Sequence, residues 1–355
     1  MVSVATYLKI SYGMAMIEIR PGTFAFAPME GVTDPLFRSF FAPVAKPDFM
    51  VTEYLRVTDN AHRSKTLVKH MPELHNGGKT VDGTPVVLQL LGGKSGPLAE
   101  TAANAAELGA HAIDLNFGCP APVVNRHDGG ASLLKSPERI GEIVGAVKRA
   151  VGSSVKVSAK LRLGWDSAEL LPQNASQAVD AGADWLTIHA RTRMQMYQPG
   201  VDWNPIAAIR EFIKVPILAN GDLWSVEDLV SCEKLSGCDA FMLGRSALAN
   251  PEAFVLYRKY RKSAVTLASD GFRLAQVEPQ ARAQYWLGLL RSWKIAVEAN
   301  PHQSVWLGGD AERYFVSRFK HWIRYLEIRN PYPWISLVKR ANNLAEIERI
   351  LESPE

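Results

Sequence analysis

The chain has 355 residues and carries 40 Lys and Arg against 36 Asp and Glu, for a formal net charge of +4. This length accommodates one large domain with a smaller one appended, and the mild positive charge permits an anionic partner without requiring one. No stretch reaches the roughly 18 consecutive apolar residues of a membrane span, so we expect no membrane partner.

The cysteine content favours a reducing compartment. The three cysteines, Cys119, Cys232 and Cys238, do not suggest a disulfide framework. We therefore expect a cytoplasmic protein. Separately, we expect a monomer. Residues 1–20 lack the basic start, apolar centre and cleavage site of a signal peptide. They are expected to form a short extension, unless Met16 is the true start.

Eight apolar, β-rich runs recur along the chain, most of them followed by a helix-like stretch. They cover residues 23–29, 49–53, 85–91, 112–118, 155–163, 185–191, 215–221 and 240–245. Predicted helices include residues 99–108, 137–150, 170–181 and 226–235. This alternation implies parallel strands with right-handed crossovers, and eight such units fit a (β/α)8 TIM barrel. A doubly wound open sheet is the alternative, because spacing alone cannot show closure.

The pattern changes after about residue 264. Strand-like runs stop, and aromatic and basic residues gather in predicted helices over 284–297, 313–328 and 335–351. We predict a barrel domain over 21–264 and a C-terminal helical domain, a helix bundle, over 265–355.

The most informative turn follows the fourth predicted strand. Cys119 stands there between Gly118 and Pro120. Chemistry in alternating α/β folds sits at the carboxyl ends of parallel strands, so Cys119 is placed as a reactive group. A small buried residue in a turn is the alternative for an isolated cysteine.

Other polar residues end the neighbouring strands. Gln89 has apolar neighbours and needs a partner, either a ring edge or another barrel residue. Lys160 and Arg162 are two residues apart on one strand and point to one face, which suits an anion or a polarised ring unless the strand end is solvated. His189, at the sixth strand end, is by itself more often structural.

Two later turns predict a phosphate site. Asn220, Gly221 and Asp222 follow the seventh strand, and Gly244 and Arg245 follow the eighth. In barrels these loops commonly hold phosphate. The chain has no GxGxxG fingerprint at these turns, so a mononucleotide is favoured over a dinucleotide. No metal site is predicted.

These segments together resemble the tRNA-dihydrouridine synthases, and most closely their bacterial C-type branch. The resemblance rests on residues 27–31 (APMEG), 116–120 (NFGCP), 125–131 (NRHDGGA), 160–166 (KLRLGWD), 189–192 (HART), 220–222 (NGD) and 244–245 (GR). It covers roughly residues 22–345. It implies an FMN enzyme with NADPH or NADH as reductant, which reduces the 5,6 double bond of a tRNA D-loop uridine at position 16.

The resemblance also implies a role for each matching residue. Cys119 is the proton donor. The cofactor-binding residues are Pro28, Met29, Glu30, Gln89, Lys160, His189, Asn220, Gly221, Asp222, Gly244 and Arg245. The uracil- and tRNA-binding residues are Arg56, Asn116, Arg162, Tyr197, Arg318, Lys320 and Tyr325. Two alternatives are a small-molecule FMN oxidoreductase of the dihydroorotate dehydrogenase or ene-reductase type, which leaves the basic helices unexplained, and a non-catalytic RNA-binding protein.

Overall fold

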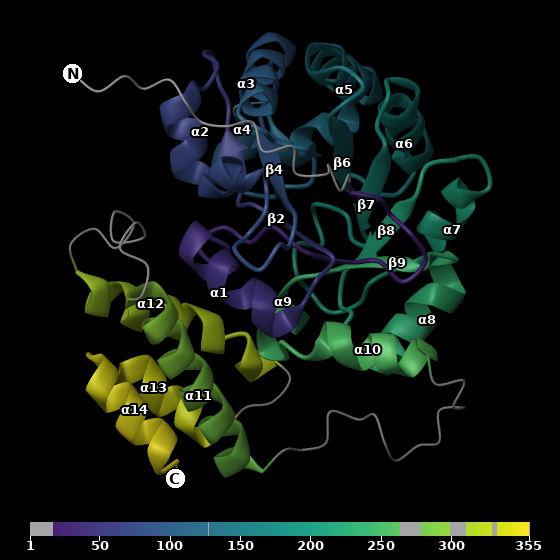
Figure 1. The fold of residues 1–355 in the computed structure, drawn as a ribbon. Helices are drawn as coiled ribbons and strands as arrows, with labels where there is room; N and C mark the ends of the chain where they lie inside the picture. Colours follow the sequence, from purple (N-terminus) through teal and green to yellow (C-terminus); the bar gives the residue numbers. More distant parts are fainter. Residues whose placement is uncertain (1–16, 127, 263–277, 299–309, 329–331, 355) are drawn as a thin grey trace, which may run out of the picture.

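The computed structural model describes residues 17–126, 128–262, 278–298, 310–328 and 332–354. These residues form a parallel barrel followed by a group of helices at one side of it (Figure 1). Met16, most of the predicted extension and the predicted boundary at residue 264 lie outside the described residues.

Eight parallel strands close into a barrel. They are β1 (Phe24–Phe26), β2 (Phe49–Val51), β4 (Val86–Leu91), β5 (Ala112–Asn116), β6 (Lys156–Arg162), β7 (Trp185–His189), β8 (Ile217–Asn220) and β9 (Ala240–Leu243). Each lies within its predicted run. Because β1 pairs with both β2 and β9, the ring has no free edge among these strands. The TIM barrel is confirmed, and the open sheet is excluded.

A short strand, β3 (Leu55–Arg56), was not predicted. It adds parallel pairs to the end of β4, Leu55 with Leu90 and Arg56 with Leu91. Two residues are too few to show a period of two in the sequence.

Helices follow the strands and cover the barrel. They are α1 (Pro35–Ala45), α2 (Ser64–His70), η1 (Pro72–Asn76), α3 (Ser95–Glu107), α4 (Pro122–Arg126), η2 (Gly130–Lys135), α5 (Pro137–Val151), α6 (Leu171–Asp180), α7 (Asn204–Arg210), α8 (Val226–Ser236), α9 (Arg245–Ala249) and α10 (Ala253–Lys262). Side chains cap several of them: Asp34 accepts from the Phe37 N–H at the start of α1, and Ser225 and Asp228 form a capping box on α8.

The C-terminal helices are α11 (Pro279–Glu298), α12 (Ala311–Ile323), η4 (Leu326–Ile328), α13 (Pro333–Arg340) and α14 (Leu344–Glu352). The predicted helices 313–328 and 335–351 are wrong in extent. After Ile323 the α-helix ends in a tighter, 3-10-type turn. The Tyr325 N–H there donates to the carbonyl of Trp322, three residues earlier, and not to a carbonyl four residues earlier. At the second break Ala341 is extended and Asn343 begins a new helix as its N-cap.

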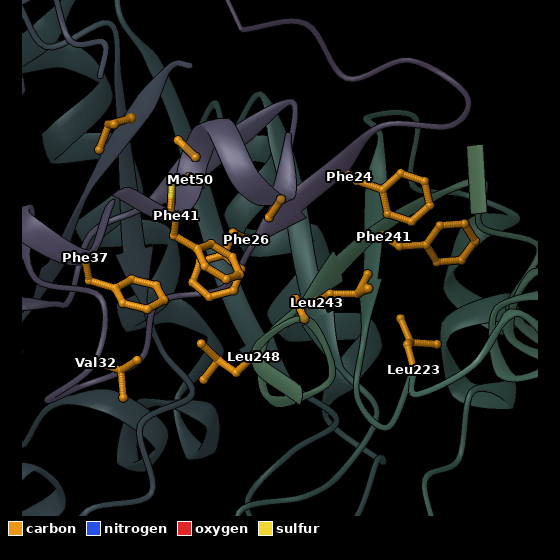
Figure 2. Packing of buried hydrophobic residues seen from close by; sticks show 14 of the residues in the cluster. Phe24, Phe26, Val32, Phe37, Phe41, Met50, Leu223, Phe241, Leu243 and Leu248 are labelled. Atoms are coloured by element: carbon orange, nitrogen blue, oxygen red, sulfur yellow. The ribbon is translucent and has the colours of Figure 1, made fainter. Parts of the chain in front are cut away.

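Aromatic side chains join the barrel to these helices. Phe26, Phe37 and Phe41 pack together between β1 and α1 (Figure 2). Trp322 of α12 stands edge-on to Phe37, with ring centroids 5.2 Å apart, and its Nε1 donates to the Leu248 carbonyl at 3.0 Å. The C-terminal helices therefore share a buried core with the barrel face that carries α1 and α9.

Candidate active site

A cavity of ≈ 690 Å³ lies at the carboxyl ends of the barrel strands. Strand register explains which side chains meet there. Gln89 of β4 is level with Asp114 of β5, and Asp114 with Ser158 of β6. Four residues further along β6, Arg162 is level with His189, and His189 with Asn220. Polar residues spaced by two along separate strands thus converge on one end of the barrel.

The structure brings most of the predicted site residues to this cavity. Those lining it are Pro28, Met29, Glu30, Gln89, Asn116, Cys119, Lys160, Arg162, His189, Tyr197, Asn220, Gly221, Asp222, Gly244, Arg245 and Tyr325. Arg56, Arg318 and Lys320 do not line it.

The turn that carries Cys119 is fixed by side-chain hydrogen bonds. Asn116 Oδ1 accepts from the backbone N–H groups of Gly118 and Cys119, both at 2.9 Å. Asn125 Nδ2 donates to the Cys119 carbonyl at 3.2 Å. Burial raises the pKa of the Cys119 thiol. Cys119 is therefore a protonated thiol at neutral pH, held at the cavity wall, and can serve as an acid.

A buried chain of hydrogen bonds leads from this turn into the barrel. Asn116 Nδ2 donates to Gln89 Oε1 at 2.8 Å, and Gln89 Nε2 donates to Asp114 Oδ2 at 2.7 Å. Ser158 Oγ donates to Asp114 Oδ1 at 2.6 Å. An ionised carboxylate can only accept hydrogen bonds, and backbone N–H groups can only donate them. The two ends of this hydrogen-bond series therefore fix the orientation of both side-chain amides, those of Gln89 and Asn116. Gln89 thus has partners within the barrel, and its contact with a ring edge stays a prediction.

Lys160 and Arg162 share a face of β6, but they differ in burial and in their hydrogen-bond partners. Lys160 is half-buried, and its Nζ donates to Asn220 Oδ1 at 3.3 Å. Loss of hydration lowers the pKa of Lys160 to about 8, and the nearby Arg162 charge adds to this shift. Arg162 is buried and donates to the Gly118 carbonyl at 2.8 Å and the Thr192 carbonyl at 3.1 Å. Arg162 therefore ties the cysteine turn to the loop after β7.

The ends of β7, β8 and β9 form a positively charged corner. His189 is buried; its pKa is lowered by loss of hydration and by the surrounding arginines and Lys160, so the ring is neutral. Its Nδ1 is buried without a hydrogen-bond partner. Asp222 pairs with Arg191 and, at 2.9 Å, with Arg245. The Asp222 carboxylate is thus occupied by cations, which leaves its backbone as the part available to an anion.

The rim of the cavity combines the barrel and the C-terminal helices. The Tyr197 ring is exposed, with the guanidinium carbons of Arg162 and Arg245 5.6 and 4.9 Å from its centroid. Tyr325 is largely buried, and the guanidinium of Arg324 lies 5.0 Å from its ring. A purely barrel-based site would lack this second wall.

The sequence analysis missed several residues at or beneath the site. They are Tyr54, Asp114, Arg191, Trp224, Arg324, Glu327, Ile328 and Lys339. Asp114 could have been found, because it lies two residues before Asn116 in an otherwise apolar strand and must share its face. Lys339 could not, because α13 reaches the cavity only through the packing of the C-terminal helices.

The fold and the cavity define a TIM-barrel enzyme whose catalytic groups sit at the strand ends. A solved structure of histamine dehydrogenase from Rhizobium sp. 4-9 matches with a TM-score of 0.52 and 15% identity. The match covers 68% of this chain and 47% of that one, and supports the barrel fold alone.

Sequence comparison places the chain more narrowly. Residues 25–279 match the dihydrouridine synthase (Dus) family. The tRNA-dihydrouridine(16) synthase of Shewanella oneidensis is 36% identical over 333 residues, which cover 93% of this chain and 97% of that protein. The enzyme of the same name from Ralstonia nicotianae is 41% identical over 290 residues, 77% of this chain and 88% of that protein. The chain belongs to the dihydrouridine synthase family.

Proposed function

We propose that the protein reduces the 5,6 double bond of a uridine in the tRNA D-loop to 5,6-dihydrouridine, with FMN as its bound cofactor. The observation that carries the proposal is Cys119: Asn116 fixes its backbone at the wall of a cationic strand-end cavity, and burial keeps its thiol protonated at neutral pH. Membership of the dihydrouridine synthase family supports the same reaction.

The residues of the cavity fit an anionic, ring-containing cofactor. Five Lys and Arg side chains line it against three carboxylates, namely Lys160, Arg162, Arg245, Arg324 and Lys339 against Glu30, Asp222 and Glu327. The buried, unpartnered Nδ1 of His189 calls for a ligand group. The loops after β8 and β9 would hold the phosphate through Asn220, Gly221, Asp222, Gly244 and Arg245. Pro28, Met29, Glu30, Gln89 and Lys160 would border the ring. When bound there, FMN would supply hydride chemistry for reduction at C6 of the uracil.

The protein's own groups supply binding and a proton. As negative charge builds on C5 and O4 of the uracil, the Cys119 thiol donates its proton to C5. Asn116, Arg162 and Tyr197 would hold the uracil against the cavity wall. A stacked or paired base cannot reach this site, so the uridine must be flipped out, at a cost of a few kcal/mol.

One experiment tests the reaction directly. The purified protein, reduced anaerobically, is mixed with unmodified tRNA transcript, and flavin oxidation and dihydrouridine are both measured. We expect oxidation to require the tRNA and one dihydrouridine to form per turnover. Oxidation by orotate or an activated alkene with none by tRNA would support a small-molecule FMN oxidoreductase instead.

The bound cofactor should be FMN and not FAD. The predicted phosphate loops follow β8 and β9, and residues 244–249 read GRSALA, without a dinucleotide fingerprint. We expect mass spectrometry of the heat-released cofactor to give the mass of FMN. Release of FAD, or failure of FMN to reconstitute the stripped protein, would contradict this.

The proposed target is uridine 16. Both relatives above are named tRNA-dihydrouridine(16) synthase. Barrel residues meet a single flipped base and do not distinguish positions, so the choice must come from how the C-terminal helices orient the whole tRNA. We expect a deletion strain to lose dihydrouridine at position 16 alone. Loss at position 17 or 20 with 16 retained would contradict the position and leave the reaction intact.

Arg56, Lys320 and Tyr325 are the proposed tRNA contacts, whereas Arg318, to which the family resemblance also gives a tRNA role, is paired with Asp34. NADPH is the proposed reductant, with NADH as the alternative. We propose a cytoplasmic monomer whose barrel domain spans residues 21–264 and whose helical domain spans 265–355. Among the described residues, no helix is long and apolar enough to cross a membrane.

Asp114 should orient the cysteine turn through Gln89 and Asn116. Asp114→Asn keeps the shape of the side chain but replaces one acceptor oxygen with an NH2 donor. The Gln89 amide can then bond in either of its two orientations. We expect uridine reduction to slow roughly 10–100-fold, as misplacing a positioned group does, with FMN still bound. Single-turnover rates on flavin-loaded protein measure this. A rate within twofold of wild type would show that the buried carboxylate does not set the turn.

A further inference from the structure

Helix α12 docks onto the loop between β1 and α1 through a cluster of polar contacts. Arg318 Nε lies 3.0 Å from Asp34 Oδ2, and the same guanidinium donates to the Gly31 carbonyl. Tyr314, one turn earlier on α12, donates its hydroxyl to Asp34 Oδ1 at 3.0 Å. Asp34 is also the N-cap of α1 and is 8% exposed. One largely buried carboxylate thus joins the barrel to the C-terminal helices.

The approach of the two parts is close at Gly31. Its φ of +74° is in the left-handed region, and an added Cβ would come within 3.3 Å of His321 Cε1 on α12. The α12 residues that meet this loop, Tyr314, Arg318 and His321, are spaced by four and three, so they lie on one face of the helix. This face is directed at the barrel rather than at solvent.

Arg318 also offsets negative charge on the barrel side. Three carboxylates gather there: Glu30 on the cavity wall, Asp34, and Glu53, which has one buried oxygen without a hydrogen-bond partner. Burial raises the pKa of Glu53 to about 7, with Glu30 and Asp34 adding to the shift and Arg318 opposing it. The other arginine of this region, Arg38, is paired with Glu73 at 2.8 Å. Loss of the Arg318 charge would therefore leave the three carboxylates with less positive charge to offset their mutual repulsion.

The docked loop and the docked helix both reach the cavity. The loop begins with Met29 and Glu30 on the cavity wall, and the chain leaving α12 places Arg324 and Tyr325 on its rim. A shift of α12 against the loop would move the rim relative to Cys119.

We infer that Arg318 is an interdomain positioning residue that fixes α12 to Asp34 and Gly31, and so sets the C-terminal helices at the angle that presents the uridine to Cys119. This inference rests on the proposed function. It differs from the assignment of Arg318 as a phosphate contact, because a guanidinium engaged by Asp34 is not free to neutralise a phosphate.

The first test needs no tRNA. Hydrogen exchange is followed by mass spectrometry in peptides covering residues 29–40 and 311–323 of the FMN-loaded protein. Arg318→Gln and Asp34→Asn should both raise exchange in both peptides. Asn can still cap α1, while the ion pair with Arg318 and one of the two Tyr314 hydroxyl contacts are lost. Lys320→Ala, a neighbouring cation that the cluster does not use, is the matched control and should leave exchange unchanged. Unchanged exchange in both Arg318→Gln and Asp34→Asn would overturn the inference.

The second test uses tRNA and a double-mutant cycle. If Arg318 and Asp34 act as a pair, each single variant should lower kcat/KM about tenfold and the double variant should lower it no further, which corresponds to a coupling typical of contacting residues. Neither should change the dependence of tRNA affinity on salt, whereas Lys320→Ala should reduce that slope by somewhat under one unit. Additive losses, with a reduced slope in Arg318→Gln, would assign Arg318 to a phosphate and overturn the inference. If Arg318→Gln does not retain its flavin, the kcat/KM and the salt dependence of Asp34→Asn decide between the two roles of Arg318. If wild-type protein does not reduce tRNA, the proposed function fails, while the exchange experiment still decides the contact.

Discussion

Replacing Cys119 with Ala is expected to slow uridine reduction roughly 10²–10⁴-fold, the usual contribution of a positioned general acid. The loss should fall on the step in which reduced flavin meets tRNA, because the thiol donates its proton only there. FMN content and the rate of flavin reduction by NADPH should remain those of the wild type. Rapid mixing of reduced protein with unmodified tRNA, followed by flavin absorbance, measures the step.

Cys232→Ala is the matched control. Cys232 is buried in α8, away from the cavity lining, so the same chemical change there should leave the rate unaltered. Because burial raises the pKa of the Cys119 thiol, the wild-type rate should not fall between pH 7 and 8 through loss of this proton. A Cys119→Ala rate within threefold of wild type would remove the thiol from the proton-donor role.

The barrel could be predicted because its evidence is local. Each strand is a short apolar run, and each site residue lies at or directly after the end of such a run. Strands that are consecutive in the sequence are also neighbours in the barrel. For that reason the sequence alone places Cys119, His189 and Asn220 at strand ends, where the structure has them. The period of two along a strand predicts that Lys160 and Arg162 share a face of β6, and it predicts the same for Asp114 and Asn116 on β5.

Contacts between distant segments could not be predicted. The family resemblance implies a tRNA contact for Arg318 in a basic and aromatic helix, yet in the structure Arg318 pairs with Asp34, 284 positions earlier in the chain. Tyr325 is likewise an aromatic residue of the kind that stacks on RNA bases, but it is only 8% exposed. Composition distinguishes a basic helix from an acidic one, and it does not determine which face of the helix packs against the barrel.

Lys160 is expected to control reduction of the flavin. Its ammonium would lie near the ring nitrogen that becomes negative on reduction, so Lys160→Met should slow flavin reduction by NADPH roughly 10²-fold, comparable to removal of one preorganised donor. The sign of the pH effect follows from the pKa of about 8, lowered from the ordinary value of 10.5 by loss of hydration. Lys160 is mostly charged well below pH 8 and becomes progressively neutral as the pH rises through that value. The wild-type rate of flavin reduction should therefore be highest below pH 8 and decline as the pH rises through that value.

The reductive reaction isolates Lys160 because Cys119 takes no part in it. Stopped-flow reduction of fully flavin-loaded protein between pH 6.5 and 9.5 gives the profile, and Lys160→Met should be slow with no decline above pH 8. Lys156→Met is the matched control, since Lys156 begins the same strand at the far end of the barrel and pairs with Asp184 at 2.9 Å. This control should keep both the rate and the pH profile of wild type. A Lys160→Met protein that retained the alkaline decline would assign the titration to another group and remove the lysine charge from flavin reduction.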